Sequence, residues 1–177
     1  CMSIVLILPN CIQAGVQRFT LPPIEDNTML SESWNAYKKR FIQFDGRVID
    51  WFDKQISTSE GQSYALLRAV WIGDRNTFDT VLNWTLNNLH KTNNHLFVWK
   101  WGKRTDGSWG IIENGSATDA DEDIALALTI AYNKWDDIRY RELAINIIKD
   151  IWSYETILIK RKRYLTAGDW VKVENDI

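Results

Sequence analysis

The chain has 177 residues, of which 45% are hydrophobic and 25% charged, and its formal net charge is -2. This composition is typical of a single soluble domain with a real core, and the balanced charge gives no electrostatic reason to expect nucleic acid as a partner. Cys1 and Cys11 are the only cysteines, so the sequence has neither a disulfide framework nor a zinc motif.

The first thirty residues are expected to form a lead-in. Residues 4–8 are apolar but too short to cross a bilayer, so we expect no membrane span. Small residues follow around Ala14, yet the basic leader of a secretory signal is missing, which leaves open whether residues 1–15 are a truncated signal segment. Residues 16–30 include Pro22 and Pro23 and are expected to be extended.

Helical patterns begin at Ser33. Four aromatic residues recur there at spacings of three and four, which predicts a helix with one buried stripe: Trp34, Tyr37, Phe41 and Phe44. A second helix is expected to begin at Glu60, because Ser59 and Gln62 have the spacing of a capping box. Residues 64–71 are apolar nearly all round, as in a helix buried on more than one side. Residues 74–89 then predict an amphipathic outer helix.

Residues 91–117 break the helical pattern with four glycines and three tryptophans, and we expect a long, functional loop there. A second buried helix should follow from about Asp119, with Ser116 or Thr118 as its cap. Residues 136–152 predict a second amphipathic helix. Residues 155–170 alternate like a β-hairpin, with the basic run 160–163 as its solvated turn.

Two pairs of a buried and an amphipathic helix predict an all-α fold of the α/α toroid type, with a small β-hairpin near the C-terminus. The inner helices of a toroid are parallel, so their N-terminal ends share one rim. Glu60 opens one inner helix and Asp119 the other, and both carboxylates are expected at the same end. Four acidic residues lie within the five positions 119–123, at the start of the second inner helix. A favourable interaction with the helix dipole explains one or two acidic residues there, but not four that repel one another.

The segment "ATDADEDIALALTIAYNKW", residues 117–135, resembles the signature of glycoside hydrolase family 8. The match runs from Ala117 to Trp135 and departs at Thr129, where the family has an aliphatic residue or glycine. "SEGQSYAL" at 59–66 is similar to the family's general-acid segment. "VWKWG" at 98–102, "DIWSYET" at 150–156 and "AGDW" at 167–170 also resemble the family.

This resemblance implies an (α/α)6 barrel and inverting endo-hydrolysis of a β-1,4-linked glycan, with a cellulose-type glucan favoured over xylan and chitosan. It implies Glu60 as the proton donor, Asp119 as the carboxylate that holds the sugar at the cleavage point, and Trp99 as a stacking platform. We also expect Gln62 and Tyr64 to contact substrate, although Gln62 is chiefly a capping residue and Tyr64 could equally be core. The family relation favours a secreted or periplasmic location.

The chemistry explains part of the acidic cluster. The acid of an inverting pair must hold its proton, which a neighbouring ionised Asp119 favours, while Asp121, Glu122 and Asp123 more plausibly cap, bind backbone or face solvent. His90 and His95 have no partners at ligand spacing, so we expect neither a metal nor a cofactor.

The family's catalytic base is an aspartate from the second half of the barrel, and we identify no base in this sequence. We therefore expect residues 31–177 to be the N-terminal portion of a catalytic domain, preceded by the lead-in 1–30. Half a barrel would expose apolar surface, which favours self-association. Two alternatives stay open: a non-catalytic glycan-binding remnant, and a plain helical scaffold whose acids and tryptophans are caps and core.

Overall fold

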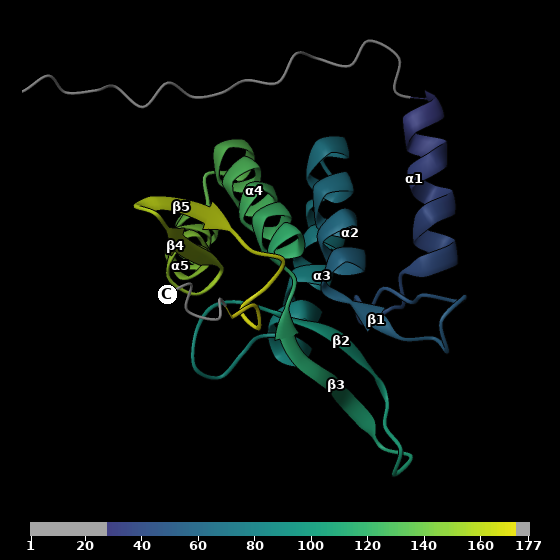
Figure 1. The fold of residues 1–177 in the computed structure, drawn as a ribbon. Coiled ribbons are helices and arrows are strands. Elements are labelled where there is room, and N and C mark those ends of the chain that lie inside the picture. Colours follow the sequence, from purple (N-terminus) through teal and green to yellow (C-terminus); the bar gives the residue numbers. More distant parts are fainter. Residues whose placement is uncertain (1–27, 173–177) are drawn as a thin grey trace, which may run out of the picture.

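The computed structural model describes residues 28–172, which form five helices and five strands (Figure 1). The helices are α1 Thr28–Phe41, α2 Ser59–Ile72, α3 Arg75–Asn88, α4 Thr118–Trp135 and α5 Ile138–Tyr154. The strands are β1 Ser57–Thr58, β2 Val98–Lys103, β3 Trp109–Ser116, β4 Thr156–Ile159 and β5 Lys162–Leu165. Within residues 28–172, none of the helices has the length and apolar character needed to cross a membrane. Residues 1–15, for which the sequence leaves a signal segment open, lie outside the described part, and the domain division at residue 30 stays a prediction.

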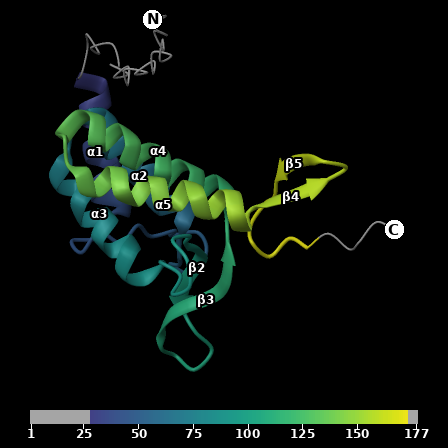
Figure 2. The ribbon, with the colours of Figure 1, turned by 90° about the vertical axis from the view of Figure 1, so that its left-hand side faces the viewer.

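Helices α2 and α4 pack against each other at the centre, and α3 and α5 lie outside them. Their facing side chains are fully buried, including Leu66 and Val70 of α2 and Ile124 and Leu128 of α4. Each such side chain contributes about 1.5–3 kcal/mol by leaving water. Figure 2 shows α5 alongside α4, with the β4–β5 hairpin beyond the C-terminal end of α5. The predicted alternation of inner and outer helices is confirmed.

Helix α1 begins at Thr28, five residues before the predicted start, so residues 28–30 are helical and not extended. Its aromatic stripe is also shorter than predicted. Trp34 is buried, and Tyr37 and Phe41 pack against the core, but Phe44 is 99% exposed. The helix ends at Phe41, and the turn that follows carries Phe44 away from the stripe.

The predicted capping box at α2 is wrong. Thr58 occupies the N-cap position, and its hydroxyl accepts a hydrogen bond from the Gly61 N–H at 3.0 Å. Gln62 instead reaches across to a neighbouring loop, where its Oε1 accepts from the Val48 N–H at 2.6 Å. Its Nε2 donates to Thr85 Oγ1 on α3 at 2.9 Å. A long-range backbone partner therefore replaces the local one that the spacing suggested.

Residues 91–117 are not a plain loop, because β2 and β3 form an antiparallel hairpin there and β1 pairs with the other edge of β2. Figure 1 shows this hairpin projecting away from the helices. Gly102 and Gly110 stand opposite each other in the ladder, and register shifts between Val98 and Trp101 interrupt the alternation of the strand. Both features hide a strand from sequence patterns, since glycine disfavours strands and a bulge breaks the period of two.

The second hairpin is confirmed, with β4 and β5 pairing antiparallel from Thr156↔Leu165 to Ile159↔Lys162. Lys160 and Arg161 form the turn with positive φ values of 47° and 66°. The basic run is exposed, as predicted for a solvated turn.

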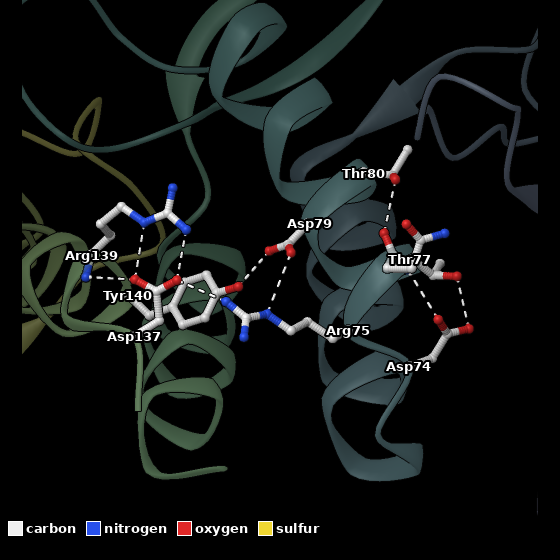
Figure 3. A network of polar contacts seen from close by, with 9 residues as sticks. Asp74, Arg75, Thr77, Asp79, Thr80, Asp137, Arg139 and Tyr140 are labelled. Carbon is white, nitrogen blue, oxygen red and sulfur yellow. Dashed lines mark hydrogen bonds and ion pairs between the residues drawn. The ribbon is translucent and has the colours of Figure 1, made fainter. Parts of the chain in front are cut away.

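A polar network ties the outer helices α3 and α5 together near their N-termini (Figure 3). Asp137 caps α5 by accepting a hydrogen bond from the Arg139 N–H. Arg75 Nη2 of α3 lies 2.8 Å from Asp137 Oδ2, and the Tyr140 hydroxyl donates to Asp79. These bonds fix the outer layer, and so the inner helices that it supports.

Candidate active site

The N-terminal ends of the two inner helices start from one small sheet. Strand β1 leads directly into α2, β3 leads into α4 after one residue, and both strands pair with β2. Glu60 in the first turn of α2 and Asp119 in the first turn of α4 are therefore at the same end of the helix layer, as the toroid pattern predicts.

A cavity of about 670 Å³ lies at this end. Its walls come from the start of α2, the β2–β3 hairpin and the segment that follows β5. The lining residues are Glu60, Trp99, Glu113, Asn114, Gly115, Ser116, Ala117, Ala167 and Trp170. The fold thus brings together Glu60 and Trp99, two residues proposed from the sequence, 39 positions apart in the chain.

Glu60 presents an unused oxygen at this cavity. Its Oε2 is buried and accepts no hydrogen bond from any described residue. A buried carboxyl oxygen without a protein partner is uncommon in folded proteins and favours a role in ligand binding or chemistry. Gly61 beside it keeps the helix start free of a bulky neighbour.

Trp99 is held in orientation by polar neighbours. Its indole Nε1 donates to Glu113 Oε2 at 3.2 Å, across the β2–β3 hairpin. The Lys100 ammonium lies 4.9 Å from the indole centroid, a cation–π distance, and 3.6 Å from Asp53 Oδ2. The ring is half-buried and lines the cavity.

Trp170 is a second aromatic wall of the cavity, and the sequence predicted no role for it. Its side chain is 59% exposed, and its Nε1 donates to the Ser116 carbonyl at 3.2 Å. A Cβ built on Gly168 would lie 2.4 Å from that nitrogen, and one built on Gly115 would lie 2.8 Å from Trp170 Cδ1. Two glycines therefore let the indole lie flat on the backbone. The sequence signal that points to Trp170 is the Gly-Asp-Trp segment, residues 168–170, which follows the β4–β5 hairpin.

The remaining predicted residues differ in their placement. Asp119 is exposed, and its Oδ1 accepts from the Ala120 N–H at 3.0 Å; it is not among the cavity-lining residues. Tyr64 is 51% exposed on α2, one helical turn after Glu60. Gln62 is fully buried, its amide is hydrogen-bonded at both ends and it is not among the cavity-lining residues, so its contact with substrate stays a prediction.

Behind the cavity lie two buried carboxyl groups, Asp121 of α4 and Glu155 at the C-cap of α5. Asp121 Oδ1 accepts from the Phe97 N–H at 3.0 Å, and Glu155 Oε1 accepts from Ser116 Oγ at 2.5 Å. Burial raises the pKa of both groups, and the charge of Glu155 raises that of Asp121 further. Asp121 therefore does bind backbone, one of the roles expected for it.

Glu155 could have been found from the sequence. It lies four residues after Ile151, which lies four after Ile147, so it continues the buried stripe of α5. The predicted cap of α4 is wrong for a related reason. Ala117 holds the N-cap position and has no side-chain acceptor, while the Ser116 hydroxyl, one residue earlier, donates to Glu155.

His95 has a carboxylate neighbour from α5, because its Nδ1 lies 2.7 Å from Asp150 Oδ2. Burial lowers the pKa of the half-buried His90, whose ring stacks edge-on against Phe97. Residues 28–172 contain no group of three or more side chains arranged to hold a metal ion.

The family model for glycosyl hydrolases family 8 matches residues 20–177. An endoglucanase of Escherichia coli K12 is 37% identical over 130 residues, which is 72% of this chain and 35% of that protein. An endoglucanase of Pseudomonas fluorescens SBW25 is 43% identical over 111 residues, covering 61% of this chain and 28% of that one. The chain thus spans about a third of the length of these relatives.

Solved structures agree with this match. An endo-1,4-D-glucanase from Vibrio fischeri ES114 superposes with a TM-score of 0.76 at 37% identity, over 81% of this chain and 43% of that one. A family 8 endo-β-1,4-glucanase from an Achatina fulica gut metagenomic library gives a TM-score of 0.76 at 32% identity, over 81% and 45%. The described helices are thus part of an (α/α)6 barrel, with the β1–β2–β3 sheet added to the predicted all-α layout.

Proposed function

Because this chain belongs to glycosyl hydrolases family 8, we propose that it supplies the proton donor and part of the glycan-binding surface of an inverting endo-β-1,4-glycan hydrolase. The similarity to proteins named endoglucanases supports a cellulose-type glucan as substrate. One observation carries the proposal: a buried, unpartnered oxygen of Glu60 faces a cavity that is also lined by two tryptophans.

Glu60 acts as the general acid in this proposal. Its proton passes to the oxygen that bridges two sugars while the bond from that oxygen to the anomeric carbon breaks. In an inverting enzyme a water molecule, activated by a second carboxylate, attacks the same carbon from the opposite face. We assign that base to none of residues 28–172, so the proposal covers the acid half of the reaction.

Trp99 and Trp170 bind the sugars on either side of the reacting bond. The C–H face of a pyranose ring can lie on a flat indole, and both indoles are held in place by hydrogen bonds, so little side-chain entropy is lost on binding. Asp119 in the first turn of α4 and Tyr64 in the second turn of α2 are exposed, within reach of a polymer that extends beyond the cavity. We propose that Asp119 accepts hydrogen bonds from sugar hydroxyls.

Azide provides a test that does not need the catalytic base, because azide is already an anion and attacks the anomeric carbon without losing a proton. We would incubate residues 1–177 with cellopentaose and azide and measure α-glycosyl azide. General acid catalysis is typically worth ~10²–10⁴-fold, so Glu60→Gln should lower the rate by at least about a hundredfold. Glu122→Gln, which removes an exposed carboxylate from α4, should leave it unchanged.

Two outcomes would contradict the proposal. An equal loss of rate in Glu60→Gln and Glu122→Gln would show that Glu60 is not the specific proton donor. Cellopentaose binding without any Glu60-dependent product would favour the glycan-binding, non-catalytic alternative for this chain.

A secreted or periplasmic location is part of the proposal, since polymeric glucan is met outside the cytoplasm. The residues that bear on a signal segment, 1–15, lie outside the described part of the chain.

A further inference from the structure

Asp121 and Glu155 are the two fully buried carboxyl groups in residues 28–172, and the proposed reaction uses neither. Asp121 belongs to the first turn of α4, and Glu155 ends α5. Placing two negative charges side by side without water costs several kcal/mol per ion, so a buried pair of this kind is rarely doubly ionised. The pair therefore requires a specific explanation.

In each residue of the pair, one carboxyl oxygen accepts a hydrogen bond and the other has no hydrogen-bond partner within residues 28–172. Asp121 Oδ1 is bonded to the Phe97 N–H and Glu155 Oε1 to Ser116 Oγ. Asp121 Oδ2 and Glu155 Oε2 are both buried, and no donor from the described residues reaches either one. The two side chains are close enough to hydrogen-bond each other, which two carboxylates can do only if one of them is protonated.

We propose that Asp121 and Glu155 share a single proton, carried by Asp121 and donated to Glu155, and that this hydrogen bond holds the wall of the glycan cavity in position from behind. The functional part of this inference rests on the proposed function, while the shared proton does not. The two residues are positioning residues, because neither lines the cavity.

The neighbouring groups decide which residue carries the proton. The hydrogen bond from the Ser116 hydroxyl favours the ionised form of Glu155, whereas the charge of Glu155 disfavours ionisation of Asp121. Burial raises the pKa of both, and it is the largest cause for each.

The charged groups packed around the pair do not replace the proton. Lys91, after α3, lies 2.5 Å from Asp169, after β5, and also donates to the Asn114 carbonyl at 2.6 Å. Its positive charge is therefore already matched by Asp169. That carboxylate in turn opposes a second negative charge on Glu155.

Ser116 connects the pair to the cavity. Its Oγ donates to Glu155 and accepts from the Asp169 N–H, its N–H donates to Asp169 Oδ1 at 3.0 Å, and its carbonyl accepts from Trp170 Nε1. Ser116 and Trp170 both line the cavity. Loss of the shared proton would therefore loosen the residue on which the Trp170 indole is oriented.

Infrared spectroscopy tests the proton directly. At pH 7 the wild-type chain should show a protonated-carboxyl stretching band that disappears in Asp121→Asn, because the amide keeps both hydrogen bonds without a titrating proton. The control Glu122→Gln changes one exposed carboxylate in the same helical turn and should keep the band. A wild-type spectrum without a band that is specific to Asp121 would overturn the shared proton.

The pH dependence of unfolding provides a second measurement. The folded-state pKa of Asp121 is raised, so the stability it confers is full below the unfolded value near 4 and is lost as pH rises toward the folded value. The ratio of the unfolding constants of wild type and Asp121→Asn should rise about tenfold per pH unit in that window. A ratio that stays constant between pH 5 and pH 8 would contradict the inference.

Cellopentaose binding tests the positioning role separately. Asp121→Ala should weaken binding and Asp121→Asn should restore it, because only the amide can replace the donated hydrogen bond. If the infrared band is present but Asp121→Ala binds like wild type, the proton is shared and the positioning role is wrong. If the wild-type chain binds no cellopentaose, the proposed function fails while the band and the unfolding ratio still decide the shared proton.

Discussion

Trp99 donates a hydrogen bond from its indole Nε1 to Glu113 Oε2 over 3.2 Å, and both side chains line the cavity at the start of the inner helices. The two residues come from neighbouring strands of the β2–β3 hairpin. The bond restricts rotation of an indole that is otherwise half-exposed, so the ring is held in one orientation without a ligand. Under the proposed function, this preorganisation lowers the entropic cost of stacking on a sugar.

Trp99→Ala should weaken cellopentaose binding by about 1–2 kcal/mol, roughly five- to thirtyfold, because the flat apolar face is lost. The far-ultraviolet circular dichroism should change little, since β2 keeps its backbone pairing and the helices do not depend on this ring. Isothermal titration and circular dichroism of the same sample provide the measurement.

Trp152→Ala is the matched control for that substitution. Trp152 is 60% exposed on α5 and is not among the residues lining the Glu60 cavity, so its loss should leave cellopentaose binding unchanged. Unfolding of Trp99→Ala would show that Trp99 is a core residue and would remove the stacking role.

Gly168→Ala should displace Trp170. The added Cβ would lie 2.3 Å from the Ser116 carbonyl oxygen and 2.4 Å from the Trp170 indole nitrogen, which are distances that no packed structure tolerates. We expect weaker cellopentaose binding, by at least about fivefold, together with a shift in tryptophan fluorescence.

A double-mutant cycle decides whether Gly168 acts through Trp170. In the Trp170→Ala background the alanine at position 168 should add little further loss, because the side chain it displaces is gone. Additive losses would mean that Gly168 matters for the backbone alone.

Residues 1–177 without azide should release no reducing sugar from carboxymethylcellulose, because we assign the proton donor to Glu60 and the base to no residue described. A reducing-sugar assay beside Glu60→Gln provides the comparison. Glu60-dependent release by a monomeric, folded sample would place the base within this chain and would contradict the assignment.

Asp74 supplies a prediction on stability. Its carboxylate caps α3 and accepts hydrogen bonds from Trp34 at 2.9 Å and Lys38 at 2.7 Å (Figure 3 shows the cap). Burial alone would raise its pKa, but the bonds from Lys38, Trp34 and Thr77 together hold the pKa well below the usual range. Stability from this carboxylate is therefore present above about pH 4 and is lost as pH falls.

Asp74→Asn should accordingly be less stable than wild type at pH 7, by about 1–2 kcal/mol from the weakened cap and the lost charged hydrogen bonds. The difference should shrink as pH falls below about 4, because the Asp74 carboxyl takes up a proton there in the unfolded chain while it stays ionised in the folded one. Urea unfolding at pH 7 and pH 3 measures both. A difference that is the same at the two pH values would show that the charge of Asp74 contributes nothing.

The sequence by itself determined the helix pairs and the position of Glu60 and Asp119 at the starts of the two inner helices. Spacings of three and four residues are local, and the burial that they imply follows from the geometry of any helix. The β4–β5 hairpin was also predictable, because its alternation and basic turn are contiguous.

Only the tertiary structure decided which hydrogen-bond partner each of these polar side chains has. Gln62 has the spacing of a local cap, but a buried Val48 N–H, 14 residues away in the chain, requires an acceptor and takes it. The same requirement turns Ser116 away from capping α4 and toward Glu155, 39 residues later. Buried polar groups must be paired wherever the fold places them, and sequence spacing does not record which distant groups share a buried space. The cavity also depends on the tertiary structure, because its walls come from three separate segments that the packing of α2 against α4 brings together. These segments contribute Glu60, Trp99 and Trp170.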